Sequence, residues 1–445
     1  MKKRNTVIIF FFVFQTVLSF CQPIDSLHLD IQKWSFHAQS TTFGQLKPSF
    51  SAKYTDTSYN SLLPNAENQG SQTITLFFGA RLWQNASVYF NPELAGGSGL
   101  SKALGLASAS NGETYRVGNP ALTYATARLF LQQIFTLNDN KIYSEGDLNE
   151  LKGYKPEKYL QLTVGKISLA DFFDTNEFAH DPRTQFTSWG LFGNGAWDYP
   201  ADVRGYTPSV IIDYITPSTE WRGAISLLPL SANGNDMNWR FWESQGLTLE
   251  LTKHLTLQDK VWNVRALVFN NTAGMGNYNQ SLAASTSTQV PDIISTRTMG
   301  RTKYGFGIST DWQMKENLGV FARASWSDGN NETWAFTEID RCFSGGAVLN
   351  GAAWNRKNDE SGLAFVLSGL SEPHKNYLKA GGKGFIIGDG DLNYAPEFVT
   401  ELRYGMSFFK NIVKLTGFYQ LFVNPAYNAD RGPVSVFSLR LHIEK

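Results

Sequence analysis

The sequence predicts an all-β protein, a transmembrane antiparallel β-barrel of about 16 strands with short periplasmic turns and long extracellular loops. Three observations lead to this fold class. An export signal stands at the start, but no later segment is apolar enough to form a membrane helix. Strand-like runs long enough to cross a bilayer recur along the chain, and the connections between them alternate between short and long.

Composition supports strands and argues against a polyanion-binding role. Of the 445 residues, 14% are aromatic and 39 are glycine, a mixture typical of strands punctuated by glycine and bordered by aromatic girdles. Lys plus Arg number 39, as do Asp plus Glu, so no net charge attracts nucleic acid or an anionic surface. We therefore expect no nucleic-acid partner.

The first residues have the pattern of a secretory signal peptide. A basic start precedes an apolar run over residues 6–20, and small residues stand at the expected cleavage after Cys21. We expect a signal peptide over residues 1–21 and a single outer-membrane barrel domain over 22–445.

A lipoprotein signal with an acylated Cys21 is the alternative, although Phe20 is larger than the residue that such processing usually accepts before the cysteine. With simple cleavage only Cys342 remains, so we expect no internal disulfide in the exported protein.

The strand-like runs share one arrangement of side chains, apolar on one face and polar on the other. In residues 437–444, Phe437 and Leu439 alternate with Ser438 and Arg440. The runs last about nine to eleven residues, longer than most globular strands and suited to a tilted bilayer crossing. Five further runs follow the pattern: 73–82, 304–312, 318–326, 398–408 and 413–423.

Aromatic residues stand at the ends of the apolar faces, where a membrane interface selects amphipathic rings. A soluble sandwich gives no reason for this placement, so the pattern favours a membrane barrel. These residues are Tyr304, Trp312, Trp326, Tyr404 and Phe408.

The predicted connections alternate in length, as they do in outer-membrane barrels. Short ones fall at 83–86, 217–219, 314–317 and 409–411. Long ones rich in Gly, Asn and Ser fall at 94–120, 168–205, 270–300, 327–360, 371–396 and 424–433. The tally is about sixteen or seventeen runs, and closure favours the even number, which leaves an aqueous channel inside. The last strand should close the barrel against the first, within residues 31–44.

Several blocks of sequence carry a family resemblance. They are 79–100, 165–186 with DPRTQF, 194–207 with NGAWDYPAD, 388–397, and 424–444 with NPAYNADRGPV. Together they resemble the carbohydrate-selective porin family of Gram-negative outer membranes. The resemblance implies a sixteen-stranded barrel that passes mono- or oligosaccharides passively, with an inward-folded loop that narrows the pore.

The resemblance also implies a bacterial outer-membrane location and its usual partners. These are outer-membrane lipid and lipopolysaccharide, the barrel assembly machinery, and either a homotrimer or a monomer as the assembly. One departure stands at Lys445, because family members usually end in an aromatic residue that the assembly machinery reads.

A sugar filter needs flat apolar faces for the C–H groups of a pyranose and, beside them, donors and acceptors that replace water on the hydroxyls. Charged side chains of both signs suit this need, because paired Arg and Glu bind neutral polyols without favouring ions of one sign. We expect six residues to line or brace the constriction: Arg81, Glu93, Arg183, Trp197, Asp198 and Arg204. No catalytic residue, cofactor or metal is expected.

These residues also have structural interpretations. Arg81 and Glu93 can be wall charges that solvate the lumen. Arg183 and Arg204 can form internal salt bridges that hold a loop, and Trp197 can anchor that loop.

Three other functions are alternatives: a general or weakly ion-selective porin, an outer-membrane barrel hydrolase, and a structural or adhesive barrel. The six histidines are scattered singly, without metal spacing or a nucleophile elbow, which disfavours the hydrolase. The glycine-rich stretch 380–391 lacks the Lys-Ser/Thr pair of a phosphate loop. A calcium loop starting at Asp389 would need Gly where Tyr394 stands. We therefore expect a channel and not an enzyme.

Overall fold

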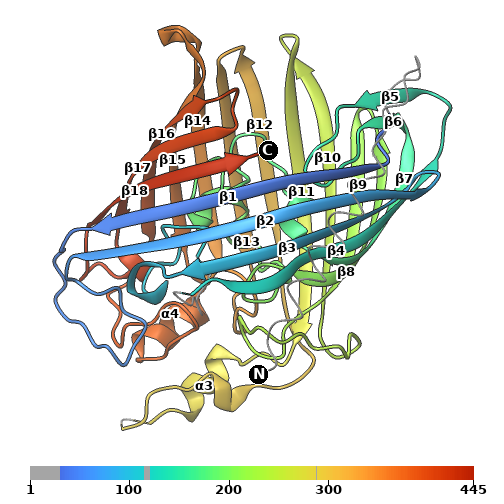
Figure 1. The fold of residues 1–445 in the computed structure, drawn as a ribbon. Helices are drawn as coiled ribbons and strands as arrows, with labels where there is room; N and C mark the ends of the chain where they lie inside the picture. The colour runs from blue at the N-terminus through green and yellow to red at the C-terminus, as the bar shows by residue number, and fades with distance from the viewer. Residues whose placement is uncertain (1–30, 115–120, 287) are drawn as a thin grey trace, which may run out of the picture.

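The computed structural model describes residues 31–114, 121–286 and 288–445, which form a closed antiparallel β-barrel (Figure 1). The predicted signal peptide lies outside the described residues. Around the ring, β1 is followed by β18 and then by each strand in descending order to β7, after which come β4, β3 and β2. The sixteen barrel strands are β1 (Trp34–Lys47), β2 (Glu67–Trp83), β3 (Ala86–Gly97), β4 (Thr123–Thr136), β7 (Tyr159–Ile167), β8 (Thr207–Thr216), β9 (Thr219–Leu227), β10 (Gln245–Leu257), β11 (Lys260–Ala273), β12 (Arg301–Lys315), β13 (Leu318–Ser327), β14 (Arg341–Gly351), β15 (Arg356–Gly369), β16 (Glu397–Phe408), β17 (Val413–Val423) and β18 (Val434–Glu444).

The remaining elements are short and belong to the connections. β5 (Lys141–Ser144) and β6 (Gly153–Pro156) pair with each other outside the ring. The α-helices are α2 (Trp189–Phe192), α3 (Tyr278–Ala284) and α4 (Glu372–Lys379), and single 3-10 turns cover Leu100–Lys102, Leu169–Asp171, Ile294–Thr296, Ala352–Trp354 and Pro425–Tyr427. In the part of the chain that the structure describes, no helix combines the length and apolarity that a bilayer crossing requires.

The wall has an apolar outer face and a polar inner face, as the alternation predicts. On β18, Leu439 is 54% exposed and Leu441 is 39% exposed, whereas Arg440 between them is fully buried. Tyr304, one of the aromatic residues expected at a rim, is half exposed on the outside of β12. The outward side chains form a surface for lipid, while the inward side chains face the lumen.

The last strand closes the barrel on the first, which confirms that prediction. β18 pairs antiparallel with β1, from Gln39 opposite Glu444 to Leu46 opposite Phe437. The closing strand β1 begins inside the expected range 31–44 and runs slightly past it.

One predicted loop, 327–360, is wrong. It contains β14 and the start of β15, which form a hairpin joined by residues 352–355. Its sequence favours a loop because it carries the pair Gly345 and Gly346 and then a run of charges after Arg356. The backbone nonetheless pairs along both edges, with β13 on one side and β16 on the other, and this ladder outweighs the weak strand propensity.

The two ends of the barrel differ, as expected, in the length of their connections. At the turn end every connection is short except residues 137–158, which join β4 to β7 and which we call the turn-side connection. It carries β5 and β6, which lie at the upper end of Figure 1, opposite α3 and α4 at the loop end. The sequence patterns did not predict this long connection at the turn end.

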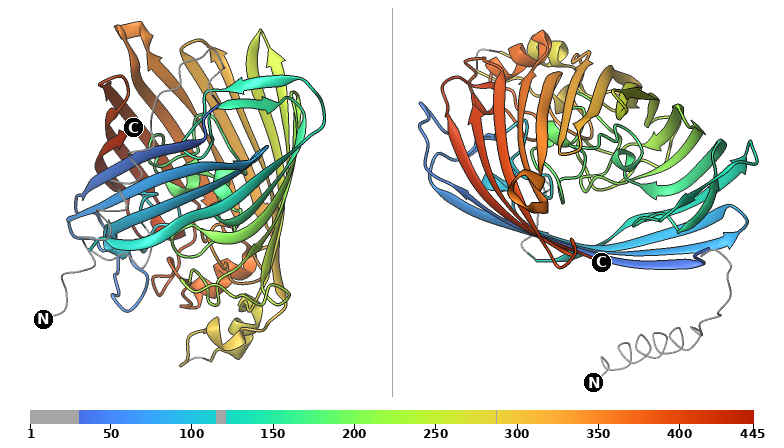
Figure 2. Two further views of the ribbon diagram at one scale, coloured as in Figure 1. Left: turned by 45° about the vertical axis from the view of Figure 1, so that its right-hand side comes forward. Right: turned by 90° about the horizontal axis from the view of Figure 1, so that it is seen from above.

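Residues 168–206, between β7 and β8, fold into the barrel, and we call them the inner loop. Seen along the barrel in the right-hand view of Figure 2, the green segment lies within the ring of strands. The inward loop implied by the family resemblance is therefore present, and it brings the predicted site residues 183, 197, 198 and 204 into the lumen.

Candidate functional site

Charged side chains on the inner wall bind the backbone of the inner loop. Arg323 on β13 donates from Nη1 to the carbonyl of Leu191 (2.7 Å) and from Nη2 to that of Ala179 (2.6 Å). Its Nε lies 2.9 Å from the carboxylate of Asp174, and both side chains are almost fully buried. Breaking a buried ion pair with such additional hydrogen bonds is costly, so this contact fixes the loop in the lumen.

Two further wall strands hold the loop near its centre. Glu401 on β16 accepts hydrogen bonds from the amides of residues 187–188 (2.8 and 2.9 Å). Arg440 on β18 donates from Nη1 to the carbonyls of Pro182 (2.7 Å) and Gln185 (2.8 Å). The polar inner face thus supplies partners to loop backbone groups that burial would otherwise leave without hydrogen bonds.

Trp197 and Asp198 brace the inner loop from inside. Asp198 is 1% exposed, and its carboxylate accepts hydrogen bonds from the amides of residues 334–336, each at 2.8 Å. Trp197 packs on Phe173 of the same loop, with ring centroids 6.0 Å apart, in a buried cluster that also contains Leu267 and Phe269 of β11. Both side chains therefore join the inner loop to its surroundings, which is the structural interpretation that the sequence allowed for Trp197.

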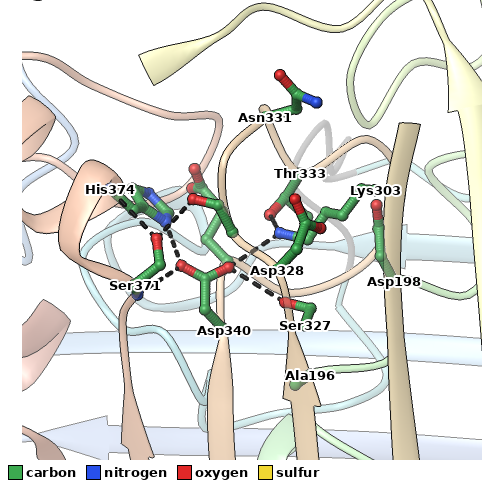
Figure 3. Close-up of polar contacts among 12 residues, drawn as sticks. Ala196, Asp198, Lys303, Ser327, Asp328, Asn331, Thr333, Asp340, Ser371 and His374 are labelled. Carbon is green, nitrogen blue, oxygen red and sulfur yellow. Dashed lines mark hydrogen bonds and ion pairs between the residues drawn. The ribbon is translucent and has the colours of Figure 1, made fainter. Parts of the chain in front are cut away.

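A buried ionic cluster around Asp340 joins segments at the loop end (Figure 3). Asp340 Oδ1 accepts from Lys303 Nζ (3.0 Å), while Oδ2 accepts from the amide of Ser371 (3.0 Å). His374 Nδ1 lies 2.9 Å from the same Oδ2, and Lys303 also donates to the hydroxyl of Thr333 (2.8 Å). The ionisable side chains of this cluster are fully buried, so their mutual pairing locks β12, residues 328–340 and the start of α4 together.

Arg183 lies where the inner loop meets β1, β2 and β3. Its guanidinium donates to four acceptors: Glu113 (2.9 Å), Glu93 (3.0 Å), Gln39 (2.9 Å) and Thr75 (3.0 Å). Burial alone would lower the pKa of Arg183, but the carboxylates of Glu113 and Glu93 outweigh burial and raise this pKa well above its ordinary value. The guanidinium is therefore charged, and its orientation is fixed.

Tyr206, at the end of the inner loop, places an aromatic ring beside these charges. Its hydroxyl donates to Glu93 Oε2 (3.1 Å). Arg128 on β4 lies over the ring, 5.2 Å from the centroid, a distance at which a cation is attracted by the ring face. Arg128 also forms a bidentate pair with Asp171, at 2.5 and 2.7 Å.

Two adjoining cavities meet at these groups. One of about 90 Å³ and one of about 470 Å³ share Glu113, Arg183, Arg204 and Tyr206 among their lining residues. Arg204 donates from Nη2 to the hydroxyl of Thr123 (2.7 Å). We use the name constriction for seven of the charged and aromatic side chains that line this space: Glu93, Glu113, Arg128, Asp171, Arg183, Arg204 and Tyr206.

The structure brings together three of the six residues expected at the site, namely Glu93, Arg183 and Arg204. Trp197 and Asp198 lie within the same loop but are engaged in packing and backbone hydrogen bonds. Arg81 lies apart from both groups, near the end of β2 at the turn end of the barrel, where it lines a different cavity of about 200 Å³.

The sequence patterns missed Arg128 because a β-bulge changes which side of β4 faces the lumen. Asn91 pairs with Arg128, but the next residue, Pro92, pairs with Thr126, so one residue of β4 is skipped. Tyr124 consequently faces outward, 62% exposed, although strict alternation puts it on the same face as Arg128.

Loop residues of the constriction were missed for another reason. Glu113, Asp171 and Tyr206 lie outside the strands, where no periodicity marks an inward side chain. The resemblance blocks contain Asp171 and Tyr206, and this was the available signal for these two.

Comparisons with known proteins agree with this architecture. The model of the carbohydrate-selective porin, OprB family matches residues 75–444. The high-pH structure of Pseudomonas putida OprB superposes with a TM-score of 0.70 at 14% identity, covering 93% of this chain and 94% of that one. The outer membrane channel DcaP of Acinetobacter baumannii gives a TM-score of 0.52 at 10% identity, covering 93% of this chain and 97% of that one. No match was found among curated proteins.

The solved structures and the family model support different conclusions. At such low identity the solved structures show a shared fold, whereas the family model covers most of the chain and shows membership. The family and the fold are those of channels, so the protein is not an enzyme and the hydrolase alternative is set aside. The chain belongs to the carbohydrate-selective porin, OprB family, and it is a passive channel for carbohydrates in the Gram-negative outer membrane.

Proposed function

We propose that this porin selects sugars at the constriction around Arg183. The observation that carries the proposal is a fixed arginine between two carboxylates, Glu93 and Glu113, with the ring of Tyr206 beside them. A sugar has hydroxyls that both donate and accept hydrogen bonds and C–H faces that pack on a ring. The constriction offers donors, acceptors and a ring around two adjoining cavities.

The presence of both signs of charge supports a sugar as the solute. The two cavities are lined by three arginines, Arg128, Arg183 and Arg204, and by seven carboxylates: Glu93, Glu113, Asp147, Glu150, Asp171, Asp181 and Asp202. The hydroxyls of a polyol can donate to the carboxylates and accept from the arginines. This mixture of donors and acceptors suits a sugar filter.

We assign different tasks to the three arginines. Among the described residues, acceptors from the protein occupy four of the five N–H donors of Arg183, so Arg183 positions Glu93 and Glu113. Arg128 lines the larger cavity and lies over Tyr206, so these two groups contact the sugar directly. Arg204 lines both cavities and is placed to contact a solute that passes between them.

Planar-bilayer conductance tests the proposal. We expect glucose or maltose to block the open channel, while a non-sugar osmolyte of similar size does not. Arg128→Gln should weaken the block about tenfold, the equivalent of one charged hydrogen bond worth about 1.4 kcal/mol. Arg240→Gln is the matched control, because Arg240 lies in an exposed ion pair outside the constriction.

Two results would count against a filter at this site. A wild-type channel indifferent to sugars would be a general porin. A block that is equally strong in wild type and Arg128→Gln, with Tyr206→Leu also unchanged, would move selection away from the constriction.

We also propose the maturation and the partners of this barrel. Residues 1–21 are removed as a signal peptide, and N-terminal sequencing of the mature protein should begin at Gln22. The barrel assembly machinery inserts residues 22–445 as one domain, whose apolar outer face supports contact with outer-membrane lipid and lipopolysaccharide. A homotrimer is the assembly to test first, by light scattering of the detergent-solubilised protein, which would give a single-chain mass if the porin is a monomer.

A further inference from the structure

The turn-side connection does not lie flat across the end of the barrel, because its middle enters the lumen. Asn91 on β3 donates from Nδ2 to Asn149 Oδ1 (2.9 Å), and the amide of Leu151 donates to the hydroxyl of Tyr89 (3.2 Å). Leu151 is 6% exposed and belongs to a buried apolar cluster that includes Tyr89 and Phe130. This part of the connection is therefore packed against the inner wall.

Two hydrogen bonds with Gln32, one to its side chain and one from its backbone, fix the same segment to the residues that precede β1. The amide of Lys152 donates to Gln32 Oε1 (2.9 Å), and the amide of Gln32 donates to the carbonyl of Lys152 (3.1 Å). Arg81 donates from Nε to the carbonyl of Gln32 (3.3 Å), so the connection, the residues that precede β1 and the end of β2 meet at one place. The segment is held by hydrogen bonds that a freely moving turn would lack.

The connection, β2, β3, β4 and β7 enclose the cavity of about 200 Å³ that Arg81 lines. Its lining combines three tyrosine rings with guanidinium, ammonium, amide and carboxylate groups: Tyr89, Tyr154 and Tyr159, and Arg81, Gln132, Asn149, Glu150, Lys155 and Gln161. This is the same combination of rings, donors and acceptors that lines the constriction.

The cavity also continues into the constriction. Gln132, Asn149 and Glu150 line both this cavity and the larger cavity of about 470 Å³ that Arg128 and Arg183 line. A solute that leaves the constriction toward the turn end therefore meets these three side chains next.

We propose that the turn-side cavity is a second carbohydrate subsite, built by the turn-side connection and placed in series with the constriction. The inference rests on the proposed function of the constriction, since both bind the same class of solute. Arg81 supplies a donor for sugar hydroxyls, and the tyrosine rings provide the flat faces. Glu150 accepts from Lys155 Nζ through Oε1 (2.9 Å), and its other carboxylate oxygen supplies the acceptor. A short oligosaccharide can contact both subsites, whereas a monosaccharide occupies them in turn.

Single-channel recording with maltose on one side of the membrane and then on the other tests this arrangement. In the double variant Arg81→Gln, Glu150→Gln, we expect the association rate from one side to fall about fivefold, the effect of one lost hydrogen bond of about 1 kcal/mol. The rate from the other side should stay at the wild-type value. Both sides are measured in each membrane, so the direction of insertion need not be known.

Lys141→Gln is the matched control, because Lys141 is exposed on β5 of the same connection and does not line the cavity. If the double variant is folded by circular dichroism and its maltose association rate equals that of the wild type from each side, the second subsite is overturned. A constriction variant such as Arg128→Gln should instead weaken block from both sides, so the two proposals fail separately. A wild-type channel that maltose does not block from either side would remove both.

Discussion

Replacing Arg323 by Gln should release the inner loop without opening the barrel. Arg323 is the wall residue that binds both the carboxylate of Asp174 and two carbonyls of the inner loop. Glutamine is shorter and uncharged, so it cannot make these three contacts together. The strand ladder of β13 with β12 and β14 does not depend on the side chain and should persist.

The free-energy cost of the substitution can be worked out from the buried groups that lose their partners. Asp174 is 1% exposed, and it would lose its cationic partner while the carbonyls of Leu191 and Ala179 would lose their donors. Removing one partner of a buried pair typically costs about 3–5 kcal/mol. Because Arg323 joins loop to wall, we expect this cost to appear as loosening of residues 168–206.

Three measurements on the purified protein in detergent or bilayers check this expectation. Single-channel current should become noisier and its mean conductance larger, and limited proteolysis should cut within the inner loop. The matched control is Arg265→Gln, because Arg265 forms a buried ion pair with Asp311 that joins β11 to β12, and its described hydrogen bond goes to that wall residue and not to the backbone of the loop. The control should lower thermal stability but leave conductance noise at the wild-type level.

Unchanged conductance and proteolysis in Arg323→Gln would refute the reasoning, since the loop would then be held without this residue. Equal noise in both variants would also refute it, because a wall-to-wall pair would then affect the loop as strongly as a wall-to-loop pair.

Two further predictions concern the rest of the barrel. Asp340→Asn should lower the free energy of unfolding by about 3–5 kcal/mol, because it leaves the ammonium of Lys303 buried without its carboxylate. The urea midpoint measures this loss, and Asp430→Asn, which breaks an ion pair with the exposed Lys53, should leave the midpoint close to the wild-type value; similar shifts would contradict the role of burial. Leu439→Arg should reduce folding into vesicles by about 2–4 kcal/mol because residue 439 faces lipid. Leu230→Arg, equally exposed but in a loop, should fold normally, and equal losses would show that residue 439 does not face the hydrocarbon.

The strands of the wall were predictable from the sequence because their two faces have different surroundings. Lipid outside and polar groups inside select side chains with a period of two, so the face of Leu439 and that of Arg440 can be read directly. The closing of the last strand on the first followed from the same pattern. Strand propensity gave the wrong prediction for residues 327–360. The glycines of β14 and the charges that open β15 indicate a loop when the neighbouring strands are unknown.

The site was predictable only in part, because its chemistry depends on contacts far apart in the sequence. Glu93 could be placed inside by alternation on β3, but a bulge hides the inward position of Arg128. Arg81 was placed on the inner face but at the wrong height, since alternation gives the face of a side chain and not its depth in the pore. The turn-side connection was missed because its ends follow no strand or turn pattern that the sequence displays.

The anchoring of the inner loop has a mechanical consequence for the barrel. Every pair of neighbouring strands is joined by a stretch of chain except β1 and β18, which meet at a seam closed by backbone hydrogen bonds. Arg183 reaches Gln39 on β1, and the carbonyls of Pro182 and Gln185 reach Arg440 on β18. The segment therefore links the two sides of the seam from within, so parting the first and last strands would also break these contacts of the inner loop. Lateral opening of the barrel and displacement of the inner loop are, by this construction, one event.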